Sequence, residues 1–395
     1  VEYLQRYPFL MVDTRLFATE FKAALLRALD DLDEQCDGVM IHSDNFQALN
    51  LLQERYKEQV KCIYIDPPFN LGKNADFLYK TDYKDSTWAA LIQNRLDIAI
   101  KLIKEDGFIY LRCDNNGNFL VRSILDGLIG FGCFQGEFIV QRIRKNVTNQ
   151  GRISMPLAND SLFLYSKYPD PTFSDPFLKL EEKRKSYWRR IDDSAGYRNP
   201  PEREIFGTIF TPYKLDAHFK YSQSSISEMI KSERIRLKCK KCGHEHYRGD
   251  WFSCGKCGSK EATPQYLVLE ADQKILDSNW MDITGYSHTT GFSTENSEVL
   301  LDRALQVASY NKDLVMDFFA GSGTTLAVAM KKNRKWLGIE QAEQIELYII
   351  PRLKRTAYKA NISGIFKVLK LESYEDTLNN LELKRPQTEL FEHMT

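Results

Sequence analysis

The chain has 395 residues, of which 43% are apolar, and its 54 basic residues balance its 54 acidic ones. This length and apolar content can supply one large hydrophobic core and one smaller module, so we expect two domains. No apolar run approaches 18 residues and no secretory signal opens the chain, which predicts a soluble, cytoplasmic protein. A net charge of zero neither supports nor excludes nucleic acid, because a binding face is a local property.

Hydrophobic periodicity predicts alternating strands and helices over residues 1–166. Helices are expected at 17–33, 46–56, 88–104 and 118–129, and strands at 38–41, 62–65 and 108–113; a last strand is expected far beyond this region, at 366–369. Residues 137–143 and 161–166 are expected to form an antiparallel pair. The alternation predicts an α/β fold with a doubly wound sheet, in which ligands bind beyond the carboxyl ends of strands near the switch point.

The tetrapeptide Asp66-Pro67-Pro68-Phe69 directly follows the apolar run 62–65, so a buried strand delivers it to one loop. Two consecutive prolines lack N–H donors and make the loop stiff. The Asp66 carboxylate and the Pro67 carbonyl can then accept both hydrogens of an exocyclic amino group, while Phe69 can stack on a nucleobase. The motif suits an adenine held outside a duplex, although an ordinary strand-end turn would also explain it.

A second loop follows the apolar run 314–318, where Phe319-Ala320-Gly321-Ser322-Gly323-Thr324 leads into a helical pattern. Gly321 and Gly323 let the backbone approach a ligand closely, and the helix start presents unpaired N–H groups. About 20 residues further on, another strand ends in Glu340, which can accept hydrogen bonds from a ribose diol. Neither G-x-G-x-x-G nor a phosphate-loop lysine is present, which favours a nucleoside without phosphates over nicotinamide or ATP.

Together the two motifs resemble those of the amino-group DNA methyltransferases that use S-adenosylmethionine. In that family Asp-Pro-Pro-Phe or Asp-Pro-Pro-Tyr holds the target amine, and Phe-x-Gly-x-Gly binds the cofactor. The catalytic motif here precedes the cofactor motif by about 250 residues, which is the circularly permuted order of the beta class. Over residues 10–166 and 286–360 the chain is most similar to the modification subunit of a Type III restriction-modification system. The resemblance implies a Rossmann-like methyltransferase fold and methylation of adenine N6.

The resemblance carries over to individual positions of the cofactor site, namely Asp317, Phe319, Gly321, Ser322, Gly323, Thr324 and Glu340. Asp44 resembles a family position near the adenosyl group, whereas the neighbouring His42 is expected to be structural. Residues 293–298 stand where the family has Thr-Glu-Lys-Pro, and Thr294 is expected to cap the helix of 299–308, beside the cofactor. Asn296 stands where the family has a lysine, so the resemblance does not support a specific contact from this position.

Residues 167–285 interrupt the α/β pattern with repeated prolines and mixed charge. Basic runs occur at 142–145, 183–190 and 231–241, and the second contains Tyr187 and Trp188. A single charged run is often only a solvated face, but three of them between the two motifs favour phosphate contacts and base stacking. We expect this insertion to recognise duplex DNA. It would separate an N-terminal half (1–166) from a C-terminal half (286–370) of the methyltransferase domain.

Cys239, Cys242, Cys254 and Cys257 form two C-x-x-C pairs, each followed by a glycine. This spacing predicts a structural zinc site with four thiolate ligands. Disulfides and a redox pair are the alternatives, but the chain has neither a secretory signal nor a thioredoxin-like pattern. His244 and His246 lie between the pairs and are expected to be bystanders.

The implied reaction is a direct methyl transfer, with the base extruded from the duplex and its N6 lone pair oriented by Asp66 and the Pro67 carbonyl. Asp66 would also stabilise positive charge that develops on N6. Residues 72–85 are expected to form a flap over the base, and 371–395 a peripheral tail. Methylation of cytosine N4 is an alternative, although that branch of the family generally has Ser at position 66. An RNA substrate, or a chain that is chiefly the DNA-recognition subunit of a larger complex, are further alternatives. The resemblance implies a restriction subunit with helicase and nuclease activity, or a second copy of the chain, as a partner.

Overall fold

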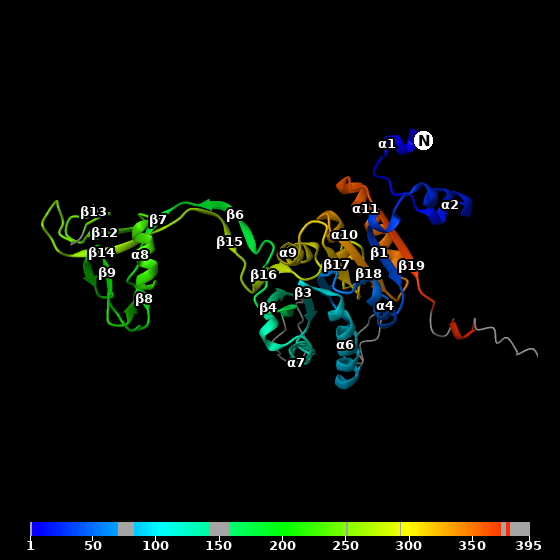
Figure 1. Cartoon of the computed structure of the whole chain (residues 1–395), viewed down its shortest axis with the longest axis horizontal. Helices are drawn as coiled ribbons and strands as arrows, with labels where there is room; N and C mark the ends of the chain where they lie inside the picture. The colour runs from blue at the N-terminus through cyan, green and yellow to red at the C-terminus, as the bar shows by residue number, and fades with distance from the viewer. Residues whose placement is uncertain are drawn as a thin grey trace, which may run out of the picture. The chain divides into compact units, whose positions relative to one another are not determined.

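The computed structural model describes residues 2–69, 83–142, 158–249, 252–292, 294–372 and 377–379. They fall into two compact units, Val1–Pro176 with Asp277–Thr395 and, inserted between them, Phe177–Leu276 (Figure 1). The expected insertion, 167–285, was too long at both ends. Phe173 packs against the core of the first unit, and strand β16 (Asn279–Thr284) joins its sheet. Within the described ranges, no helix has both the length and the apolar character that a membrane crossing requires.

The described part of the first unit is built on a nine-stranded sheet with the order β16-β4-β5-β3-β2-β17-β18-β1-β19. Its remaining strands are β1 (Cys36–His42), β2 (Val60–Ile65), β3 (Ile103–Cys113), β4 (Phe134–Gln141), β5 (Asn159–Ser166), β17 (Leu314–Asp317), β18 (Lys335–Glu340) and β19 (Ile365–Lys370). Strand β5 runs antiparallel to both of its neighbours, β3 and β4, while the other described pairs are parallel. The α/β sheet and the antiparallel pair near one edge are therefore confirmed.

The centre of the sheet joins segments that are far apart in the sequence. Strand β2 pairs in parallel with β3 on one side and with β17 on the other, and Met316 lies beside Ile63. From β2 the chain continues outward to β3, whereas from β17 it continues outward to β18 in the opposite direction. This reversal is a topological switch point, and such sheets bind ligands beyond the strand ends at that point.

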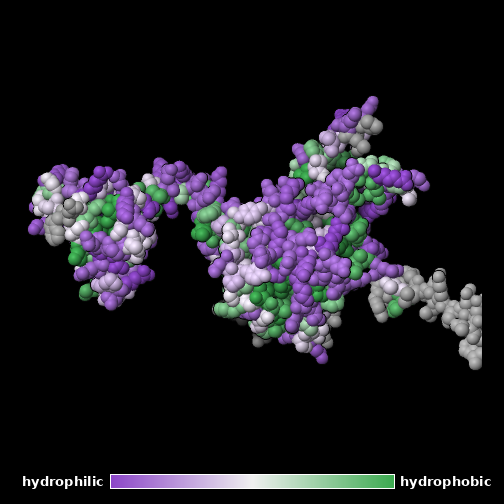
Figure 2. All heavy atoms as spheres, in the orientation of Figure 1, coloured by the Kyte–Doolittle hydropathy of each residue, from purple (hydrophilic) through white to green (hydrophobic). Residues whose placement is uncertain are grey.

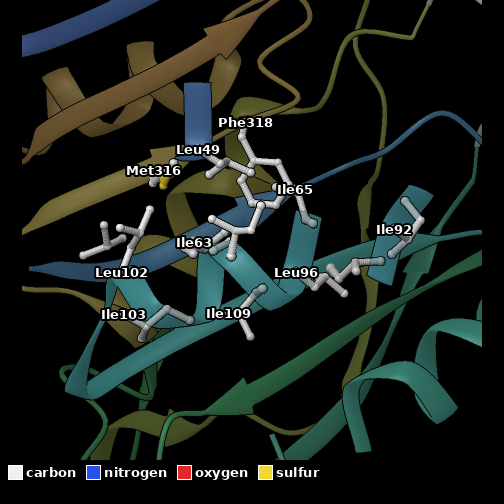
Figure 3. Close-up of a cluster of buried hydrophobic side chains, with 14 of the residues drawn as sticks. Leu49, Ile63, Ile65, Ile92, Leu96, Leu102, Ile103, Ile109, Met316 and Phe318 are labelled. Atoms are coloured by element: carbon white, nitrogen blue, oxygen red, sulfur yellow. The ribbon is translucent and has the colours of Figure 1, made fainter. Parts of the chain in front are cut away.

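Helices cover both faces of the sheet. The helices described in the first unit are α1 (Glu2–Arg6), η1 (Thr14–Leu16), α2 (Thr19–Ala28), α3 (Leu32–Gln35), α4 (Asn45–Leu51), α5 (Gln53–Tyr56), α6 (Asp85–Ala99), η2 (Ile100–Leu102), α7 (Asn118–Leu128), η3 (Phe131–Cys133), α9 (Glu298–Ala308), α10 (Thr324–Lys331), η4 (Ile345–Ile349) and α11 (Ile350–Ala360). Strand side chains alternate between faces. Ile63 and Ile65 of β2 pack in one apolar cluster with Leu49 of α4 and Leu96 of α6 (Figure 3), and α7 contributes to the same cluster. Cys62 and Tyr64 pack on the other face with α9, α10 and α11.

Three expected helices differ from the observed ones, the simplest case being 46–56, which Leu52 divides into α4 and α5. The predicted helix 17–33 is interrupted, because α2 ends at Ala28 and Asp31 adopts a left-handed conformation with φ of 47° before α3 begins. The helix predicted to reach residue 104 already ends at Ala99, and β3 starts at Ile103. A continuous apolar pattern does not distinguish the end of a buried helix from the start of a buried strand.

The second unit has its own small core. It contains β6 (Phe177–Arg184), β7 (Tyr187–Arg190), β8 (Ser194–Ala195), β9 (Arg203–Ile205), β10 (Thr208–Phe210), β11 (Ala217–His218), α8 (Gln223–Lys231), β12 (Ile235–Cys239), β13 (Glu245–His246), β14 (Ala262–Val268) and β15 (Ala271–Ile275). Strands β13-β12-β14-β7 form a four-stranded sheet, and Ile235, Leu237 and Tyr266 pack from it against Ile226 and Met229 of α8. Figure 2 shows hydrophilic residues spread over the visible face of this unit around smaller apolar patches.

Candidate active site

The Asp66 loop leaves β2 at the carboxyl edge of the sheet, as the sequence predicts. The indole Nε1 of Trp88, on α6, donates a hydrogen bond to the Pro68 carbonyl oxygen at 2.7 Å. Trp88 is 1% exposed, so the loop is tied to a fixed point in the core. Phe69 is also buried, at 7% exposure, within the same apolar cluster. Its ring is packed inside the protein here, and its stacking on a base stays a prediction.

The glycine loop leaves the neighbouring strand β17. Gly321 and Gly323 have φ of +51° and +75°, a region that favours glycine, so both positions need the residue that the sequence supplies. The Asp317 carboxylate closes the turn by accepting bonds from the Phe319 N–H at 3.0 Å and the Thr325 hydroxyl at 2.6 Å. Burial raises the pKa of Asp317 to about 7.

Glu340, at the end of β18, fixes the same loop from the other side. Its Oε2 accepts a hydrogen bond from the Gly321 N–H at 2.8 Å, and its Oε1 accepts from the Gln341 and Ala342 N–H groups. Burial raises the pKa of Glu340. An ionised carboxylate has about four acceptor positions, so three backbone bonds leave capacity for a further donor.

Asp66 lies against a buried polar network. Its Oδ2 accepts a hydrogen bond from Asn296 Nδ2 at 2.8 Å and lies 3.7 Å from Arg112 Nη1. Burial raises the pKa of Asp66 to about 6, and the nearby Arg112 charge opposes this shift. Asn296 therefore makes a specific contact with Asp66, although the family pattern does not support a contact from this position.

Several predicted cofactor residues use their side chains inside the protein. Asp44 caps α4 by accepting from the Phe46 and Gln47 N–H groups, and it pairs with Arg95 at 3.2 Å. Ser322 and Thr324 share a hydrogen bond of 3.1 Å, and both accept from the buried Arg352. Their part in binding a cofactor stays a prediction, which would rest on backbone groups rather than on these hydroxyls.

The expected cap of α9 by Thr294 is wrong. Helix α9 starts at Glu298, its N-cap residue is Ser297, and no side chain caps it. The helix begins three residues later than a Thr294 cap requires. His42, which is expected to be structural, contacts a segment distant in the sequence, because its Nε2 lies 3.0 Å from the Gln341 carbonyl oxygen.

Three largely buried contacts of charged residues were missed by sequence reasoning. Arg112 pairs with Asp160 at 2.6 Å, Arg352 pairs with Glu295, and Arg95 donates to Asn45. A usable signal existed for one of them. Arg112 interrupts the apolar run of β3, and a charge inside a buried strand requires a partner. The partners come from distant segments, which the sequence does not indicate.

The four predicted cysteine ligands lie together in the second unit, with their sulfur atoms within 4.8 Å of one another. The Cys239–Cys257 and Cys242–Cys254 sulfur pairs are 3.6 and 3.5 Å apart. Four sulfurs around Zn²⁺ at about 2.3 Å would be separated by roughly 3.8 Å, so this geometry can hold a zinc ion. Backbone N–H groups of Cys242 and Lys241 lower the pKa of the Cys239 thiol to about 6, whereas burial and the neighbouring thiols raise that of Cys257 to about 12, so without a metal the four thiols do not all favour the thiolate.

Three predicted features lie wholly or partly outside the described residues. Most of the expected flap, 72–85, falls in the gap between 69 and 83, and α6 begins at its last residue, Asp85. The basic run 142–145 is described only at Arg142. The tail 371–395 is described at 371–372 and 377–379.

Two loops, one rich in acceptors and one rich in glycine, leave adjacent strands at the switch point of the α/β sheet, where folds of this class bind their ligands. The model of the DNA methylase family matches residues 60–350, and the chain belongs to this family.

Known members of the family are similar to the chain over most of its length. A probable type III restriction-modification enzyme HindVI Mod subunit from Haemophilus influenzae is 25% identical, over 87% of the chain and 55% of the relative. The type III EcoPI Mod subunit of Escherichia phage P1 is 22% identical, over 86% and 62%. The type II methyltransferase M.EcaI of Enterobacter cloacae is 24% identical, over 76% and 66%. The chain thus spans little more than half the length of the two Mod subunits.

Proposed function

We propose that the chain is a site-specific DNA methyltransferase that transfers a methyl group from S-adenosylmethionine to N6 of an adenine flipped out of duplex DNA. The observation that carries this proposal is the pairing of β2 with β17, because it brings the Asp66 loop and the Gly321 loop to adjacent strand ends. One loop offers acceptors to an amine, and the other can receive a nucleoside. The order of these two strands in the chain supports a circularly permuted methyltransferase fold.

The glycine loop fits the adenosyl part of the cofactor. Its positive-φ glycines bring the backbone close to a ligand, and Glu340 retains acceptor capacity for a ribose hydroxyl. Phe292 lies beside Gly321, 3.7 Å from where a Cβ would be, and contacts the Tyr348 ring edge-on. When bound, S-adenosylmethionine supplies an electrophilic methyl group on a sulfonium.

The Asp66 loop prepares the acceptor nitrogen. The N6 lone pair of adenine is delocalised into the ring, so the amine is a weak nucleophile until its N–H bonds are held in a new geometry. Asp66 and the Pro67 carbonyl accept these N–H bonds and direct the lone pair toward the methyl donor. The ionised Asp66 would then stabilise the positive charge that develops on nitrogen as the N–C bond forms and the S–CH3 bond breaks, after which the nitrogen releases one of its two protons.

The second unit is our candidate for DNA recognition. Phe177–Leu276 contains 20 lysines and arginines and 14 acidic residues, so it is basic although the whole chain is neutral. Tyr187 is 45% exposed and could stack on a base, whereas Trp188 is occupied by Arg236, whose guanidinium carbon lies 4.4 Å from the ring centroid. A structural zinc held by Cys239, Cys242, Cys254 and Cys257 would fix the loops at the end of β12. Phosphate contacts by the basic residues would set the register on DNA.

We further propose that the chain acts in a restriction-modification system, as the names of its relatives suggest for them. A restriction subunit and a second copy of the chain are the partners we consider. Co-purification from the native host would distinguish a solitary methyltransferase from a component of a restriction complex.

A transfer assay tests the proposal. The purified chain is incubated with methyl-labelled S-adenosylmethionine and mixed-sequence duplex DNA, and the DNA is digested and analysed for methylated nucleosides. The detection of N6-methyladenine supports the proposal. The detection of N4-methylcytosine instead would show that cytosine N4, and not adenine N6, is the methylated atom. DNA binding without transfer would identify a recognition subunit, and preferential labelling of competing RNA would exclude the DNA assignment.

A further inference from the structure

Arg112 lies behind the Asp66 loop and is completely buried. Its Nη1 donates to the Asn296 Oδ1 at 2.7 Å and to the Gly285 carbonyl oxygen at 2.8 Å, and its Nη2 donates to Asp160 Oδ2 at 2.6 Å. The Tyr286 ring covers it, with the guanidinium carbon 4.0 Å from the ring centroid. The guanidinium thus has fixed partners from strand β5 and from the segment before α9.

The backbone around Arg112 is shaped to admit it. A Cβ at Gly285 would lie only 2.3 Å from Arg112 Nη2, so any other residue there would displace the guanidinium. Asn296 is held next to this position by a β-bridge with Tyr286, and the Ser297 N–H donates to the same Gly285 carbonyl at 3.0 Å. Both partners of Asp66 are therefore placed by well-packed backbone.

The chemistry of the two neighbours fixes which way the Asn296 amide points. A guanidinium has only donors, so the amide oxygen must face Arg112. An ionised carboxylate has only acceptors, so the amide nitrogen must face Asp66. The distances of 2.7 and 2.8 Å agree with this orientation. Arg112 therefore aims the N–H of Asn296 at Asp66.

We propose that Arg112 and Asn296 are a positioning pair that occupies Asp66 Oδ2 and keeps Oδ1 for the target amine. This inference rests on the proposed function. Neither residue is assigned a contact with the substrate or cofactor; both act through Asp66.

The pair should also influence the protonation of Asp66. Burial alone favours the protonated acid, which would offer a donor to the amine, whereas Arg112 and the Asn296 N–H both favour the carboxylate. Charged or titratable side chains from the surrounding strands and loops also act on or near Asp66, namely Arg112, Asp160, Arg142, Asp317, Tyr64, Tyr286 and Cys113. Among the described residues, Asn296 and Arg112 make the direct approach to its Oδ2.

The test uses two variants of the pair in the full chain. Asn296→Leu removes the donor at nearly constant volume. We expect kcat for methyl transfer to fall by about 10²-fold, as for a misplaced reacting group, with the affinity for S-adenosylmethionine within about twofold of wild type. The acid limb of its kcat–pH profile should move to higher pH. Arg112→Lys keeps the charge but loses the planar fork that aims Asn296, so kcat should fall with a smaller movement of the limb.

Asn311→Leu is the matched control, because Asn311 lies away from the site, in the turn before β17, where its side-chain oxygen accepts from the guanidinium of Arg334. Its kcat and pH profile should match those of wild type. A purely structural role for Asn296 would lower thermal stability and the amount of active enzyme but leave the pH profile of the remaining activity unchanged. That result, or wild-type kcat in Asn296→Leu, overturns the proposal.

A readout without catalysis separates this inference from the proposed function. The Asp66 carboxyl is titrated by carbon NMR in wild type and in Asn296→Leu, with Asp66→Asn used to assign its signal. A higher pKa in Asn296→Leu supports the pair even if no DNA is methylated, in which case only the proposed function fails. An unchanged pKa overturns the electrostatic part of the pair even in an active enzyme.

Discussion

The indole nitrogen of Trp88 donates a hydrogen bond to the Pro68 carbonyl oxygen at 2.7 Å, joining helix α6 to the Asp66 loop. A loop of two prolines cannot form backbone bonds from its own nitrogens, so this external donor supplies an anchor.

Trp88→Phe should therefore lower the transfer rate by about 10-fold through misplacement of Asp66, a smaller effect than loss of a directly acting group. Trp336→Phe is the control, because Trp336 is equally buried but its Nε1 has no hydrogen-bond partner in the described structure. Both variants lose packing, but Trp88→Phe also breaks a hydrogen bond, so it should lose more thermal stability by calorimetry, while kcat falls only in this variant. If the two variants transferred methyl groups at equal rates, the Trp88 hydrogen bond would have no part in placing Asp66.

Asp66→Ala should abolish transfer, since losing one preorganised interaction commonly costs about 10²–10³ in rate. Cofactor binding should remain, because the glycine loop is built from β17, β18 and their own hydrogen bonds. Isothermal titration with S-adenosylmethionine and a labelled-methyl assay measure the two effects. Turnover near the wild-type rate would refute the role of Asp66.

The pH dependence has opposite signs for activity and for stability. Burial raises the pKa of Asp66 to about 6, and the working form is the carboxylate, so kcat should fall as the pH drops through about 6. Because the folded-state pKa is raised, folding favours the protonated acid. The contribution of Asp66 to stability is therefore greatest below its unfolded pKa and is lost as the pH rises through about 6. Asp66→Asn should remove this part of the stability change, which denaturant unfolding across the pH range can measure.

Gly323→Ala should destabilise the protein by about 1 kcal/mol or more and weaken cofactor binding. Gly323 has φ of +75°, and a Cβ would approach Ile349 to 3.0 Å. Gly127→Ala is the opposite case, because Gly127 lies in α7 and a Cβ added there would meet nothing within 4 Å. That substitution should stabilise by about 0.5–1 kcal/mol without changing activity. Urea unfolding of both variants distinguishes backbone conformation from a general effect of a methyl group.

The second unit should contain about one equivalent of zinc, since four thiolates form a closed structural site. Cys254→Ser should lose the metal, destabilise this unit and weaken DNA binding. Cys133→Ser, in the first unit and outside the cluster, should retain it. Elemental analysis of fresh, unchelated protein measures the content. Substantially less than one equivalent in wild type would count against the zinc assignment.

The alternating strands and helices, the two loops and the cysteine cluster could all be predicted from the amino-acid sequence. These are local signals, because strand and helix periods, the X-Pro constraint and C-x-x-C spacing are all contained within a few residues. Asp66 and Gly321 accordingly fall at strand ends, and the four cysteine sulfurs lie together.

The groups that surround Asp66 and the start of the inserted unit became known only from the three-dimensional structure. Arg112 and Asn296 are 184 positions apart, and Asp160 belongs to a third segment, so no local pattern records that they meet. Strands β16 and β4 also come from opposite sides of the insertion in the sequence, so no local pattern predicts that they pair. A charged residue within a buried strand predicts that a partner exists. The identity of that partner depends on how distant segments of the chain pack together.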